Sequence, residues 1–128
     1  MREPKFRVWD KRYKQYVEPY AICLDGRAIA ITAPSNDFET LDSERVIIEF
    51  STGLKDKNGR EVYEGDILQD IEGDTAIVFW RAQQADWGIR WCENKAEGSL
   101  SSRMHWGELK DVIGNIHENQ ELLEEEQK

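Results

Sequence analysis

The feature that most restricts the fold of this chain is a series of short β-type runs separated by turn signals. The strongest runs, residues 45–50 and 75–80, are rich in β-branched and aromatic side chains, which favour extended backbone. Between runs stand pairs such as Asn58-Gly59, which readily supply the positive φ of a tight turn. Short strands at this spacing, without long helices, are typical of small antiparallel barrels rather than of a parallel sheet.

The same pattern places nine strands along the chain. We expect them at residues 6–9, 16–24, 28–32, 45–50, 62–63, 67–71, 75–80, 87–91 and 111–116. Asp37 or Thr40 offers a cap for a short helical turn near residues 38–41, and residues 93–107, with their glycines and serines, are interpreted as a long loop. Only residues 118–126 have the pattern of a helix.

A turn containing Glu64-Gly65-Asp66, followed by a strand, a hairpin and a second strand, is common in SH3-like barrels. The sequence therefore predicts a mostly β protein with an N-terminal β segment at residues 1–50. An SH3-like β-barrel with a short C-terminal helix is expected at residues 51–128.

Charge restricts the classes of partner. The 128 residues hold 17 Lys and Arg against 26 Asp and Glu, a net charge of −9, which disfavours nucleic acid and anionic membranes because phosphate contacts need a cationic surface. Residues 1–20 are the exception, with six basic and three acidic side chains. No apolar run approaches a membrane span, and the first residues do not form a signal-peptide core. Two distant cysteines favour reduced thiols in a cytoplasm.

Three segments carry a resemblance to a known family. Residues 52–68 read TGLKDKNGREVYEGDIL, residues 2–10 read REPKFRVWD, and residues 112–119 read VIGNIHEN. Together they resemble the YopX-like family of phage and prophage proteins from end to end. The resemblance implies an accessory protein acting in the bacterial host cytoplasm, with an SH3-like C-terminal part, and it supplies no catalytic residues.

The 52–68 motif is dense in glycine and acidic residues, so we tested it as a ligand site. A calcium loop starting at Asp56 needs glycine at its sixth position, which is Glu61, and no phosphate-binding Gly-x-x-x-x-Gly-Lys pattern occurs. The favoured interpretation is that the glycines form turns and the acids cap them. The alternative is a partner-binding loop that exposes Lys55, Lys57, Arg60 and Tyr63.

Catalytic and metal chemistry find little support in the sequence. The spacing of Cys23, Cys92, His105 and His117 contains none of the paired ligands that announce a zinc site. Glu64 and Asp66 are the best acid–base pair, but no pocket is indicated that would perturb one pKa. We therefore predict no metal, no cofactor and no enzymatic activity.

A cluster of tryptophans interleaved with arginines is the most informative candidate site. It consists of Trp80, Arg81, Trp87, Arg90, Trp91, Arg103 and Trp106. Trp87 and Trp91 are four apart, so on one strand they face the same side. Such a face either fills the core of a small barrel or binds a peptide, a base or a subunit.

The sequence thus predicts a non-enzymatic module that binds a protein, either a host factor or a second copy of itself. A homo-oligomer is expected because the small N-terminal segment has aromatic and aliphatic side chains to bury, namely Phe6, Val8, Trp9, Tyr16 and Tyr20. The alternative is a nucleic-acid-binding module that uses a Trp/Arg face of the barrel.

Overall fold

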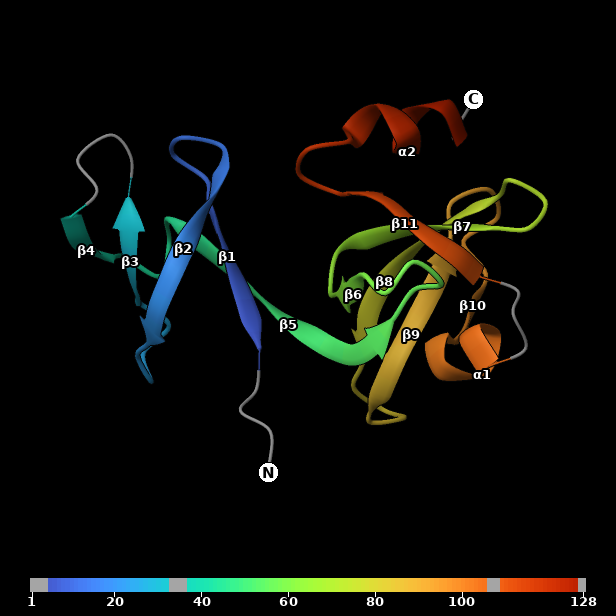
Figure 1. Cartoon of the computed structure of the whole chain (residues 1–128), viewed down its shortest axis with the longest axis horizontal. Helices are drawn as coiled ribbons and strands as arrows, with labels where there is room; N and C mark the ends of the chain where they lie inside the picture. Colours follow the sequence, from blue (N-terminus) through green and yellow to red (C-terminus); the bar gives the residue numbers. More distant parts are fainter. Residues whose placement is uncertain (1–4, 33–36, 106–108, 127–128) are drawn as a thin grey trace. The chain divides into compact units, whose positions relative to one another are not determined.

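The computed structural model describes residues 5–32, 37–105 and 109–126 (Figure 1). The chain divides into two compact units, Met1–Ser51 and Thr52–Lys128. The expected boundary after Phe50 lies one residue before this division. Each unit is described by itself.

The N-terminal unit is an antiparallel sheet with the strand order β4-β3-β2-β1-β5. Its strands are β1 (Phe6–Asp10), β2 (Gln15–Ile22), β3 (Ala28–Thr32), β4 (Asp37–Leu41) and β5 (Val46–Lys55). Alternate residues of the strands form a small core whose members are at most 7% exposed: Val8, Val17, Ala28, Ala30, Leu41 and Val46. β5 continues into the C-terminal unit, where it pairs with β6 (Glu61–Tyr63).

The C-terminal unit is built on a curled five-stranded antiparallel sheet with the order β10-β9-β8-β7-β11 (Figure 1). Its strands are β7 (Asp66–Asp70), β8 (Thr75–Arg81), β9 (Asp86–Trp91), β10 (Glu97–Ser99) and β11 (Leu109–Asn115). Helix α1 (Leu100–His105) precedes β11, and helix α2 (Gln120–Glu126) follows it.

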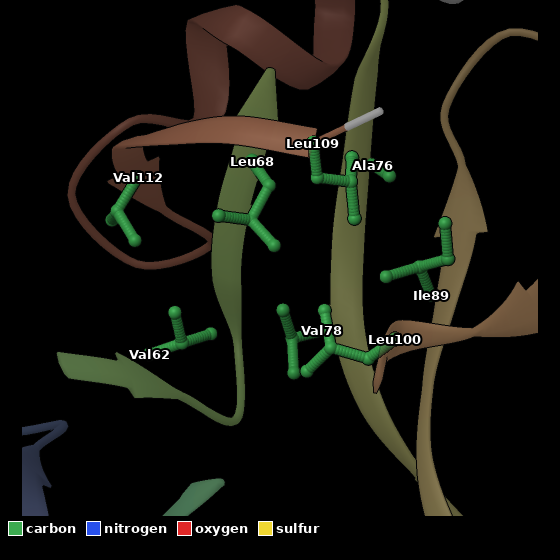
Figure 2. Packing of buried hydrophobic residues seen from close by; sticks show 8 residues of the cluster. All are labelled: Val62, Leu68, Ala76, Val78, Ile89, Leu100, Leu109 and Val112. Atoms are coloured by element: carbon green, nitrogen blue, oxygen red, sulfur yellow. The ribbon is translucent and has the colours of Figure 1, made fainter. Parts of the chain in front are cut away.

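The concave side of this sheet holds the core of the C-terminal unit (Figure 2). Its buried side chains come from β6, β7, β8, β9, α1 and β11: Val62, Leu68, Ala76, Val78, Ile89, Leu100, Leu109 and Val112. Full burial of one valine, leucine or isoleucine stabilises a fold by about 1.5–3 kcal/mol, so this cluster is the main source of stability in the unit.

The prediction of a mostly β protein with a barrel-like sheet and a short C-terminal helix is confirmed. Two local predictions were wrong. Residues 38–41 form part of strand β4, because pairing with β3 (Ile31 opposite Phe38) outweighs the weak propensity of a four-residue turn. The expected loop at residues 93–107 contains β10 and α1, where Leu100 is fully buried and anchors the helix.

Candidate functional site

Asp56 is the centre of the 52–68 motif. Its carboxylate is 5% exposed and accepts three backbone N–H groups: Oδ1 from Asn58 at 3.0 Å and Arg60 at 2.8 Å, and Oδ2 from Val112 at 3.0 Å. Burial raises the pKa of Asp56, but the N–H groups of Val112, Arg60 and Asn58 outweigh it and hold the pKa below 3.8. The carboxylate is thus a structural acceptor that ties the turn to β11.

Two further side chains of the motif reach β11 beside Asp56. Arg60 donates from Nη1 to the carbonyl of Val112 at 3.0 Å, and Asn58 donates from Nδ2 to Asp111 Oδ1 at 2.9 Å. The side chains of Asp56 and Arg60 therefore bind the N–H and the C=O of Val112. The backbone of a neighbouring strand would make the same two hydrogen bonds. The motif closes the open edge of β11 with side chains.

The Glu64-Gly65-Asp66 turn has a similar structural role. Gly65 has a φ of 86°, its N–H donates to Val78, and its carbonyl accepts from Ile116. Asp66 is 2% exposed and accepts the N–H of Tyr63 at 2.8 Å. The acid–base pair considered from the sequence thus belongs to a hydrogen-bonded turn that joins β8 to the end of β11.

In the motif at residues 112–119, asparagine side chains likewise cap backbone N–H groups. Asn115 Oδ1 accepts the N–H groups of His117 and Glu118, and Asn119 Oδ1 accepts the N–H of Asn115. A Cβ at Gly114 would collide with the Asn119 side chain, which explains glycine at this position. Six polar residues of the motifs at 52–68 and 112–119 therefore have structural roles: Asp56, Asn58, Arg60, Asp66, Asn115 and Asn119.

Of the loop residues predicted to bind a partner, Lys55 and Lys57 are exposed. Arg60 is exposed but bonded to β11, and Tyr63 is half-buried. The positive φ expected at Gly59 is confirmed at 82°, with no atom near its open side.

Trp80, Trp87 and Trp91 lie on the core side of the β8–β9 hairpin. Trp87 and Trp91 pack against the core cluster, and Trp80 stands directly opposite Trp87. The Trp80 and Trp87 rings meet edge to face at a centroid distance of 5.1 Å and an angle of 73°. Trp80 remains 46% exposed at the rim. Trp106 lies outside the described residues.

The arginines of the hairpin point to the other side of the same strands. Arg81 forms two hydrogen bonds of 2.7 Å with Asp86, its cross-strand neighbour, and Arg90 pairs with Glu97 at 3.1 Å while lying over Phe79. Residues an odd number apart on a strand face opposite sides, so Trp80 and Trp87 share no face with Arg81 and Arg90. The single Trp/Arg face expected on this hairpin is absent. Arg103, on α1, lies near Gly98.

One acidic turn lies between β7 and β8. The carboxylates of Asp70, Glu72 and Asp74 approach within 4.8 Å of one another, beside a shallow hollow of about 170 Å³ that Trp91 also lines. Asp70 Oδ1 accepts the N–H groups of Glu72 and Asp74, so the carboxylates gather because they cap the turn.

In the N-terminal unit, the aromatic and aliphatic side chains expected to need burial are divided between the two faces of the sheet. Phe6 and Val8 belong to the core side, whereas Trp9 packs edge-on against Tyr16 at 4.9 Å on the other side. There Tyr16 also donates to the buried Glu49, which accepts from Arg7 at 2.8 Å. Tyr20 is in β2, and its side chain lies outside the described part of the structure.

Sequence reasoning missed one polar cluster in this unit. Arg45 binds the fully buried Asp10 through two hydrogen bonds, Nε–Oδ1 at 3.0 Å and Nη2–Oδ2 at 2.8 Å. The bond with Arg45 is the main reason that the pKa of Asp10 lies below 3.8. The sequence places Asp10 just after the expected strand at residues 6–9, and its distance of 35 residues from Arg45 gives no signal of this pairing.

The fold and these motifs define a small antiparallel β protein whose turns are tied to distant strands by side-chain caps. A family model described as YopX protein matches residues 5–124, so the chain belongs to the YopX protein family, as the resemblance indicated. The crystal structure of protein EF1440 from Enterococcus faecalis is similar at 28% identity and a TM-score of 0.62. That match covers 96% of this chain and 99% of the other.

The comparison with curated proteins found no match. The descriptions of the family and of the crystal structure name no activity, and nothing in them points to catalysis. Within the described ranges, no helix has the length and apolarity that crossing a bilayer requires.

Proposed function

We propose that this protein is a non-enzymatic accessory module that binds another protein through the rim of the β8–β9 hairpin, with Trp80 as the anchor. The observation that carries the proposal is the 46% exposure of this large side chain, held edge-on by Trp87. Exposed tryptophans on rigid supports dominate the energetics of many protein interfaces.

Two contacts brace the hairpin beneath Trp80. Arg81 and Asp86 form a bidentate ion pair across the strands next to it. Gly88 leaves room for the Arg81 side chain, since a Cβ there would overlap it. A preorganised hairpin loses little conformational entropy on binding.

A protein partner fits this surface better than nucleic acid does. The chain has a net charge of −9, and Arg81 and Arg90 lie on the side opposite Trp80, each paired with a carboxylate. The partner is a host factor or a second copy. The proposed setting is the bacterial cytoplasm, which follows from the resemblance to phage and prophage proteins.

The experiment is affinity capture from a nuclease-treated bacterial lysate with wild type, Trp80→Ala and the matched control Ile71→Ala. Ile71 is 66% exposed in the same unit. We expect a discrete protein to be retained by wild type and by Ile71→Ala, and at least tenfold less of it by Trp80→Ala, since hot-spot truncations cost about 2 kcal/mol or more. Equal retention by all three folded variants, or a protein that wild type retains only from a parallel lysate without nuclease, would refute the proposal.

A further inference from the structure

The turn between β1 and β2 is a compact basic surface on an acidic protein. Lys11, Arg12, Tyr13 and Lys14 are all exposed, and Tyr13 is 54% exposed. Within the described part of the chain, Lys11 and Lys14 form no salt bridge, so the turn keeps three positive charges at its surface.

Two guanidinium groups flank the exposed ring. The Cζ atom of Arg12 lies 5.5 Å from the Tyr13 ring centroid, and that of Arg45 lies 5.4 Å from it. Cation–π contacts of this kind orient the ring and the Arg12 side chain together. The turn therefore exposes the aromatic ring of Tyr13 between cationic side chains.

Two hydrogen bonds fix the backbone of the turn. Asp10 Oδ1 accepts the N–H of Arg12 at 2.9 Å, and Lys11 donates its N–H to the carbonyl of Arg45 at 2.9 Å. The nearby carboxylates, Asp10 and Glu39, both pair with Arg45. They anchor the turn through Arg45, and within the described ranges neither of them forms a salt bridge with Lys11 or Lys14.

Negative charge is concentrated at residues 118–126. Residues 118–126 contain five glutamates and no lysine or arginine, and Glu118 and Glu121 are exposed. The last turn of α2 has no basic residue. A helix C-terminus carries a partial negative charge, so glutamates there are unfavourable until a cation approaches. Docking on a basic surface would relieve this local conflict.

We propose that the basic turn at residues 11–14 binds the acidic segment at residues 118–126 of a second copy of this chain. Each copy carries both surfaces, so two copies related by a twofold axis form the contact twice. Once the first contact has formed, the second forms within the same complex at a high effective concentration. It therefore strengthens the dimer without a further kind of interface. The inference concerns a surface distinct from Trp80 and stands or falls independently of the proposed function.

The test compares charge-reversal variants of the full chain by light scattering. The turn variant is Lys11→Glu with Arg12→Glu, and the tail variant is Glu124→Lys with Glu125→Lys. The matched control, Arg27→Glu with Lys95→Glu, makes the same charge change at two other exposed turn positions. Circular dichroism and melting curves establish that each variant is folded.

We expect wild type and the control to form a dimer of about 30 kDa at low salt, twice the 15.0 kDa chain, and to dissociate at about 0.5 M salt. Each reversed variant alone should dimerise at least tenfold more weakly. A 1:1 mixture of the two should recover the dimer, because each reversed surface then faces its opposite.

Three results would overturn the proposal. The first is a monomer for wild type at 100 μM protein and low salt, which includes the case of docking within one chain. The second is a dimer that neither reversal weakens. The third is nucleic acid that co-purifies with wild type and is lost from the turn variant, which would assign the basic turn to phosphate binding instead.

Discussion

Replacement of Asp56 with alanine should strongly destabilise the C-terminal unit, although the carboxylate belongs to a turn and not to the hydrophobic core. The substitution removes one acceptor from three backbone N–H groups at once. It also unlinks the turn from β11, which lies 56 residues further along the chain.

The size of the stability loss depends on whether each of the three backbone N–H donors is buried or exposed. The N–H of Val112 belongs to a core residue that is 9% exposed, so losing its charged acceptor leaves it unsatisfied at a cost of about 2–3 kcal/mol. Asn58 and Arg60 are exposed and can rebind water, so each of their bonds contributes about 0.5–1 kcal/mol. The expected loss in the free energy of unfolding is about 3–5 kcal/mol.

Asp56→Asn is the matched variant. It keeps one oxygen acceptor for the turn but turns an amide NH₂ toward the Val112 N–H, so we expect a loss of about 2–3 kcal/mol. Urea denaturation at pH 7, followed by tryptophan fluorescence, measures both values. A loss below about 1 kcal/mol for alanine would refute the claim that Asp56 closes the edge of β11.

The pH dependence gives an independent check. The pKa of Asp56 in the folded protein lies below its ordinary value, so its stabilisation is fully present above about pH 5 and is lost as pH falls through the folded value. The difference in unfolding free energy between wild type and Asp56→Asn should therefore shrink between pH 4 and pH 2. A difference that stays constant over this range would contradict the proposed ionised acceptor.

Two glycine substitutions test the backbone of the same motifs. Gly59 has a φ of 82° with open space around it, so Gly59→Val should lower the melting temperature more than Gly59→Asn, which tolerates this region; equal melting temperatures would count against the assigned turn. Gly114→Ala should destabilise by about 1–3 kcal/mol because the new methyl group collides with Asn119. Adding Asn119→Ala should make the two effects non-additive, whereas simple additivity in urea denaturation would show that the clash is absent.

Much of the strand pattern follows from the sequence because it depends on neighbouring residues. The predicted run at residues 28–32 is β3 with the same bounds, and the predicted runs at residues 75–80 and 87–91 differ from β8 and β9 by one residue at one end. β-Branched runs and glycine turns act through local sterics, which are the same wherever the segment lies.

The alternation of side chains along a strand also separates the tryptophans of the β8–β9 hairpin from its arginines. Trp80 and Arg81 are adjacent, and Trp87 and Arg90 are three apart, so strand geometry alone puts the members of each pair on opposite sides. What the pattern does not reveal is that Trp80 pairs with Trp87, since that register depends on how the loop between β8 and β9 closes.

The functions of the acidic residues were decided by tertiary structure alone. The sequence placed Asp56 in a turn and Asp10 at the end of a strand, but not opposite Val112 or Arg45. The distant member of each pair is brought near only when whole strands have paired and the core has formed, since closing a long loop costs entropy that one hydrogen bond does not repay. Local sterics therefore determine the strands and turns of this protein. Which partners its polar side chains contact is determined by the strand pairing and by the burial of its two hydrophobic cores.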